Sequence, residues 1–117
     1  MGPTPDSDQS AVVHEAWDGR MRVEIRALIS DDLIAEHRRK PLGQHSDALE
    51  RVLNYLRRQP QAQKYIIVCV RPWEEWRIGV LSGVRGVAPT ISSEERFTSE
   101  LEAEHGVFLR RVRDLMS

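Results

Sequence analysis

The chain has 117 residues, 40% of them hydrophobic, and a net charge of −1 at pH 7. This length suits one domain with a modest core, and the charge gives no overall attraction to nucleic acid or to an anionic membrane. No apolar run approaches the ~18 residues of a membrane-spanning helix, and the first residues do not resemble a signal peptide. We therefore expect a cytoplasmic protein without membrane contact. The single cysteine, Cys69, cannot form an internal disulfide and reads as a small buried hydrophobe.

Residues 1–10 are expected to form a flexible tail, because their prolines, glycine and aspartates leave little apolar surface to bury. The remaining residues, 11–117, should form a single α+β domain. From about residue 20 to residue 39 the apolar residues recur at helical spacing, and "ISDD" is a point where this helix can divide in two. Pro41 and Gly43 end this segment.

The strongest helix signal is "SDALERVLNYLRRQP", which has Ser46 and Asp47 at its start, one apolar stripe, and Pro60 at its end. Two strands are expected at residues 65–70 and 76–81, joined by "RPWEE" as a hairpin loop. Residues 82–93 read as a connecting loop. The last helix begins near Ser99 and contains Gly106, whose cost of about 1 kcal/mol suggests that another group approaches closely there.

The first strand of this hairpin is apolar on both faces, since residues 65–70 include no charged side chain. Both faces of such a strand require cover. We expect a fold of three or four α-helices packed on a β-hairpin, in which the helices cover one face. The other face then needs a partner, either a different chain or a second copy of this one.

Sequence patterns for catalysis or metal binding are weak. The basic clusters at 38–40, 57–58 and 110–113 each fall at the end of an expected helix, where cations favour the helix dipole. "HSD" at 45–47 is a helix start, because sequence neighbours cannot adopt the geometry of a hydrolytic triad. No two histidines have metal-ligand spacing on a helix, so we expect no metal in this chain. The sequence also contains no active-site constellation and no phosphate-binding glycine pattern, so we expect no catalytic residue or cofactor. His105 is expected to be hydrogen-bonded and partly buried, with a ligand or acid–base role as the alternative.

Trp73 and Trp76 flank the hairpin turn. Tryptophan at such a place can be an interface anchor, a lid over the core or a platform for a ligand, and all three interpretations stay open. The interface expected from the sequence consists of the two tryptophans and three further apolar or aromatic residues: Trp73, Trp76, Ile78, Tyr65 and Phe108.

The order of segments resembles the small (alpha) subunit of N,N-dimethylformamidase. The similar segments are "EHRRKPLG", "LERVLNYLRRQP", "KYIIV…EEWRIGVL" and "ERFTSELEAEHGVFLRR", within residues 24–111. The resemblance implies a non-catalytic small subunit that packs against a much larger one, which carries the iron-dependent amidohydrolase site. The amino terminus and "SGVRGVAPTISS" depart from the family pattern.

Three functions follow as hypotheses. The first is an accessory subunit that docks through the hairpin and its tryptophans onto a larger amidohydrolase chain. The second is a stand-alone homodimer that encloses a pocket for a small molecule. The third, disfavoured by the net charge, is a nucleic-acid binder that uses Arg110, Arg111 and Arg113.

Overall fold

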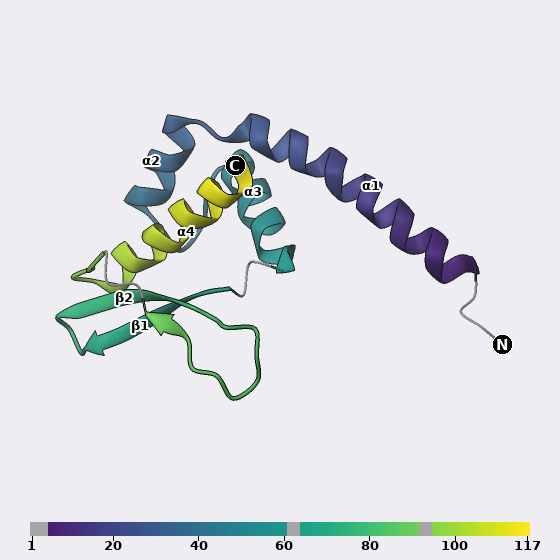
Figure 1. The fold of residues 1–117 in the computed structure, drawn as a ribbon. Coiled ribbons are helices and arrows are strands. Elements are labelled where there is room, and N and C mark those ends of the chain that lie inside the picture. Colours follow the sequence, from purple (N-terminus) through teal and green to yellow (C-terminus); the bar gives the residue numbers. More distant parts are fainter. Residues whose placement is uncertain (1–4, 61–63, 92–94) are drawn as a thin grey trace.

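The computed structural model describes residues 5–60, 64–91 and 95–117, with side chains from residue 17 onward. This part of the chain contains four helices and a three-stranded antiparallel sheet in the order β1-β2-β3, which confirms the expected α+β class (Figure 1). The helices are α1 Pro5–Leu28, α2 Asp31–Arg39, α3 Asp47–Arg58 and α4 Glu100–Met116. The strands are β1 Tyr65–Arg71, β2 Glu75–Val80 and β3 Thr90–Ile91.

Helix α1 begins earlier than the apolar spacing indicates. Its first residue is Pro5, a residue type that is well tolerated in the first turn of a helix. Of the ten residues expected as a tail, residues 5–10 therefore belong to α1, and residues 1–4 lie outside the described residues. The amino-terminal half of α1 extends beyond the body of the molecule (Figure 1).

The expected break at "ISDD" is confirmed, because α1 ends at Leu28 and α2 begins at Asp31. Helices α2, α3 and α4 each begin directly after a serine that caps the helix. Ser30 adopts an extended conformation, and its hydroxyl accepts a hydrogen bond from the Leu33 N–H at 3.1 Å, which starts α2. Ser46 caps α3 in the same way, while its own N–H and hydroxyl donate to the Glu36 carboxylate at 2.7 and 2.6 Å. Ser99 caps α4 through the Glu102 N–H. These caps fix where each helix begins.

The larger apolar cluster lies between the four helices. The apolar stripe of α3 supplies about half of it, as its spacing predicts. The buried members are Ile25, Leu33, Leu49, Val52, Leu53, Tyr55, Leu56, Phe108, Val112 and Leu115. Helix α4 therefore contributes the carboxyl-terminal half of its buried face to this cluster.

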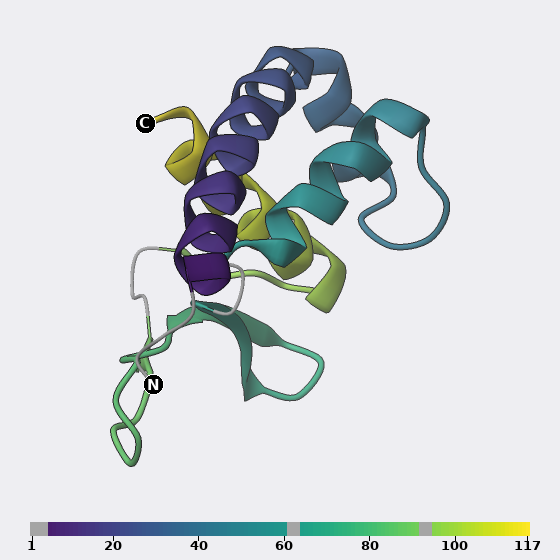
Figure 2. The same ribbon diagram turned by 90° about the vertical axis from the view of Figure 1, so that its right-hand side faces the viewer.

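A smaller cluster joins the sheet to α4. Tyr65 pairs with Val80 and Ile67 with Ile78 across β1 and β2, so these four side chains share one face of the sheet. Tyr65 and Ile78 pack with Val107 of α4. Figure 2 shows the helices on one side of the sheet only. The expectation that the helices cover a single face of the hairpin is confirmed.

The other face of the sheet carries the alternate residues. Ile66 pairs with Gly79 and Val68 with Arg77, and Ile91 of β3 pairs with Gly79 on its other side. Ile66 and Val68 lean over Gly79, where an added Cβ would lie 3.0 and 3.2 Å from them. Ile91 is 46% exposed. Strand β3 falls in the segment expected to be a loop, because two residues are too few to produce an alternation.

Gly106 provides the first test of this packing. An added Cβ there would lie 2.5 Å from Cζ of Phe97, so the expected close approach is confirmed. We expect Gly106→Ala to lower the free energy of unfolding by about 1–3 kcal/mol through overpacking, although alanine favours helices. Gly19→Ala in α1 is the matched control, because nothing lies within 4 Å of its added Cβ, and it should not destabilise the fold. Urea titration of both variants checks this, and equal stabilisation of the two would contradict it.

Candidate functional site

The hairpin turn holds its tryptophan in an unusual backbone conformation. Residues 71–74 form a four-residue turn, in which the Glu74 N–H donates to the Arg71 carbonyl at 3.0 Å. Trp73 has φ +67°, and it is the only non-glycine residue with positive φ in the described part of the chain. A turn with proline second and positive φ third is of type II, and its third position favours glycine. Tryptophan at this position costs about 1–2 kcal/mol.

The side chain of Trp73 gains nothing from the fold that offsets this cost. It is 89% exposed, the largest exposed fraction among the large hydrophobic residues described. An indole in water forgoes the burial that would stabilise it by about 2 kcal/mol or more. Of the three interpretations open from sequence, a lid over the core is therefore excluded for Trp73, and an anchor or a ligand platform remains.

Trp76 is held more firmly. Its backbone N–H donates to the Phe97 carbonyl at 2.8 Å, and the Phe97 N–H donates to the Trp76 carbonyl at 2.9 Å. Trp76 is partly buried and pairs with Cys69 across the hairpin. Cys69 itself is exposed, which corrects the expectation that it is a buried hydrophobe, because β1 runs past the end of the covering helix.

The hairpin end contains an open hollow of about 380 Å³. We call the residues that line it the hairpin-end patch, and they are Ile67, Cys69, Pro72, Trp73, Trp76 and Glu100. All but one are apolar or weakly polar, which is typical of the central part of a protein–protein interface. Glu100 places a single negative charge at the rim.

The other three residues of the expected interface lie elsewhere. Ile78 is fully buried, and Tyr65 and Phe108 are 6% and 3% exposed. Ile78 and Tyr65 pack between sheet and α4, whereas Phe108 belongs to the cluster between the helices. The chain's own atoms cover these side chains, so little of them is left for a partner. Of the five residues expected at the interface, only Trp73 and Trp76 still have side-chain surface available for a partner.

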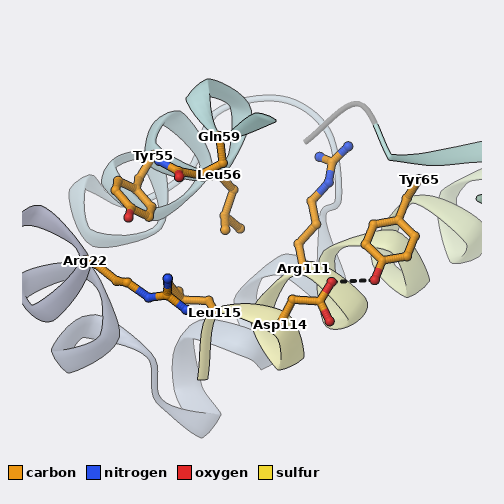
Figure 3. Close-up of a pocket in the computed structure, with 8 residues that line it drawn as sticks. All are labelled: Arg22, Tyr55, Leu56, Gln59, Tyr65, Arg111, Asp114 and Leu115. Atoms are coloured by element: carbon orange, nitrogen blue, oxygen red, sulfur yellow. Dashed lines mark hydrogen bonds between the residues drawn. The ribbon is translucent and has the colours of Figure 1, made fainter. Parts of the chain in front are cut away.

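A second, small hollow lies where α1, α3, α4 and β1 meet (Figure 3). Its volume of about 30 Å³ has room for roughly one water molecule. The Tyr65 hydroxyl donates to the Asp114 carboxylate at its edge. Burial and, after it, this hydrogen bond raise the pKa of Tyr65. The bond ties the sheet to α4, and the cavity is too small for an organic ligand.

Two histidines that are far apart in sequence meet inside the fold. Nδ1 of His37 lies 2.8 Å from Nδ1 of His105, and the His37 ring stacks on Phe108 with centroids 4.0 Å apart. The two side chains are 4% and 7% exposed. Burial, followed by the charges of His105 and His45, lowers the pKa of His37 to about 4. The hydrogen-bonded, buried role expected for His105 is confirmed, but the pair itself joins positions 68 residues apart, which no local pattern reveals.

The histidine pair should make the fold sensitive to acid. A histidine titrates near pH 6.5 when unfolded, so between pH 6.5 and about 4 the unfolded chain binds a proton that folded His37 does not. We expect the free energy of unfolding to fall over this window by about 3 kcal/mol. Glu36, whose pKa is lowered by its hydrogen bonds from Ser46, loses its contribution only below pH 4.5.

Urea unfolding at a series of pH values measures this effect. His37→Gln should flatten the slope between pH 6.5 and pH 4.5 while lowering stability at neutral pH, because it disturbs the stack on Phe108. An unchanged slope in this variant would show that other groups cause the acid sensitivity.

The described residues contain no group of three or more side chains that could hold a metal ion. No helix in the same part of the chain combines the length and apolar character needed to cross a bilayer. The fold and the hairpin end define a small α+β chain with an exposed aromatic residue, Trp73, in a strained backbone conformation. Exposed aromatic residues of this kind are used in protein–protein contacts.

Comparison with known proteins shows the family of this chain. The family model of the N,N-dimethylformamidase alpha subunit matches residues 12–117. An N,N-dimethylformamidase alpha subunit from Alcaligenes sp. is 38% identical over 118 residues, covering 97% of this chain and 88% of the relative. One from Paracoccus aminophilus is 37% identical, covering 97% and 82%. The chain belongs to the N,N-dimethylformamidase alpha subunit family, which confirms the resemblance found in its sequence.

Proposed function

We propose that this chain is a non-catalytic small subunit that docks on and stabilises a larger, iron-dependent amidohydrolase chain of the N,N-dimethylformamidase type. Family membership supports the role of a small subunit, since the relatives are named alpha subunits of that enzyme. In this proposal the iron and the reacting groups belong to the larger chain, this chain holds no cofactor, and the complex works in the cytoplasm. Neither a membrane nor nucleic acid is a partner.

The observation that carries the docking proposal is the state of Trp73. Its backbone has the positive φ that glycine prefers, and its side chain is 89% exposed. Both features lower the stability of the chain on its own. A partner that buries the indole would recover the lost burial, and the strained turn keeps the ring projecting outward in the free chain. Such preorganisation reduces the entropy lost on binding.

The hairpin-end patch offers a surface that suits this role. Two backbone hydrogen bonds to Phe97 hold the main chain of Trp76, and its partly buried ring lines the same hollow as Trp73. The hollow of about 380 Å³ between them can receive a side chain of the partner. Aromatic anchors of this kind carry much of the binding free energy in interfaces.

The alternative is a stand-alone homodimer that binds a small molecule. One observation favours it: within the described residues β1 pairs only with β2, so its outer edge is open to a second strand. The apolar face with Ile66 and Val68 would then lie near the twofold axis. Light scattering on the purified chain separates the two proposals, because a tight homodimer favours the alternative.

Trp73→Gly tests the docking proposal through opposite effects on folding and assembly. Glycine relieves the positive φ, so the free energy of unfolding of the isolated chain should rise by about 0.5–1 kcal/mol after the entropy cost of glycine. Binding to the larger chain should weaken by about 2–4 kcal/mol, since the anchor is lost. Urea titration and calorimetric binding measure the two quantities.

Trp73→Ala is the matched control, because alanine removes the indole and keeps the strain. It should weaken binding as much as glycine does and leave the stability of the isolated chain nearly unchanged. If both variants bind the larger chain as tightly as the unaltered protein, Trp73 is not the anchor.

Trp76→Ala should behave differently from either variant. Its ring is partly buried, so the variant should lose stability in the isolated chain and also bind more weakly, by about 2–4 kcal/mol. Lower stability with unchanged binding would assign Trp76 to the core alone. The same two measurements decide this.

A further inference from the structure

A hollow of about 420 Å³ lies between the end of α2 and the amino-terminal half of α4, on elements that pack together in Figure 1. It is distinct from the hairpin-end patch, with which it shares no lining residue. Its size falls within the range of about 300–1,000 Å³ that is typical of small-molecule sites. The residues that line it are Arg38, Arg39, Pro41, Glu95, Phe97, Leu101, Glu102, His105, Gly106 and Leu109.

Two arginines, Arg38 and Arg39, and two glutamates, Glu95 and Glu102, line this hollow, and the two glutamates already have partners within the chain. Glu102 accepts hydrogen bonds from the Thr98 N–H and hydroxyl at 3.1 and 2.9 Å, and Glu95 lies 3.6 Å from the Arg110 guanidinium. Both carboxylates therefore already have partners. Arg38 and Arg39 make no ion pair within 4.0 Å with another described residue, although, after the hydrogen bonds from Ser46, the charge of Arg39 helps to lower the pKa of Glu36. Two guanidinium groups remain available for an anion, and guanidinium groups fit carboxylates in a bidentate manner.

His105 adds a buried polar atom without a partner. Its Nδ1 contacts His37, while its Nε2 is buried and makes no hydrogen bond within the described part of the chain. The side chain is 93% buried, since 7% is exposed, and it lines the hollow. When His37 donates the proton between the two Nδ1 atoms, the neutral ring of His105 carries its own proton on Nε2. This N–H can then donate to an oxygen in the hollow.

The rest of the lining is apolar. Phe97, Leu101 and Leu109 present carbon surface, and Pro41 closes the side next to α2. Leu101 is 50% exposed and Leu109 36%, so this surface is still open in the free chain. A ligand with an apolar body could cover it and gain from burial.

We infer that this hollow binds a small organic carboxylate with an apolar body, such as an aromatic or branched aliphatic acid. Arg38 and Arg39 bind the carboxylate, Nε2 of His105 donates to one of its oxygens, and the carbon part rests on Phe97, Leu101 and Leu109. The inference does not depend on docking to a larger chain, because none of these residues belongs to the hairpin-end patch.

Titration of the full chain with benzoate and with benzamide tests the site. The two probes have the same shape and differ in charge. Benzoate should bind and shift the ring signals of His105 in NMR spectra, whereas benzamide should bind at least about tenfold more weakly. The His105 signals are identified by their loss in His105→Gln. Equal binding of the two probes, or no binding of benzoate at millimolar concentration, would overturn the proposal.

Charge-neutral variants locate the contact. Arg38→Gln and Arg39→Gln should each weaken benzoate binding about tenfold, because each removes a charge-assisted hydrogen bond. Both arginines are exposed, so the fold should persist, which urea titration verifies. Arg57→Gln is the matched control: it also removes a cation from the last turn of a helix, but Arg57 does not line the hollow, so binding should be unchanged. Equal affinities in all three variants would place benzoate elsewhere and overturn the inference.

Discussion

Packing on α4 is the constraint on which the rest of this structure depends. Neighbouring residues of a helix point about 100° apart, so Val107 and Phe108 face different layers. Val107 packs on the sheet, whereas Phe108 packs among the other helices and on His37. One helix therefore holds together two apolar clusters that would otherwise be separate. The hydrogen bond from Tyr65 to Asp114 joins the carboxyl-terminal end of α4 to β1.

A single helix can cover only one face of a sheet, and the exposed features of the molecule follow from this geometry. Helix α4 covers the face with Tyr65 and Ile78, so Ile66 and Val68 are left to shield each other over Gly79. The far end of the hairpin also lies beyond the helix, which leaves Cys69 and Trp73 in solvent. These surfaces are open because the chain is short and has too few residues to cover every apolar side chain.

Local sequence chemistry predicted the elements well. Serine caps, the apolar stripe of α3 and the two strand-like runs of the hairpin are all local patterns of a few residues, and the structure follows them. The two-sided apolar character of β1 also indicated that one face stays uncovered. Local patterns could not predict whether an apolar residue faces the core or a partner. Ile78 and Phe108 are interface candidates in the sequence, but tertiary packing buries both.

The features of the candidate sites that sequence reasoning missed all depend on contacts between distant segments or on backbone angles. His37 and His105 meet only because α2 crosses α4, and the positive φ of Trp73 is a property of the turn rather than of the residue. Proline at the second position of a turn favours this conformation at the third, but the third residue is then usually glycine and not tryptophan.

Phe97 contributes to both surfaces for which a role is proposed. Its backbone pairs with Trp76 at the hairpin end, and its ring packs against the place where Gly106 has no side chain, forming part of the wall of the hollow beside Arg38. The fit of the ring at Gly106 is tight, because an added Cβ there would lie 2.5 Å from it. One residue thus contributes its backbone to the hairpin end and its ring to the hollow.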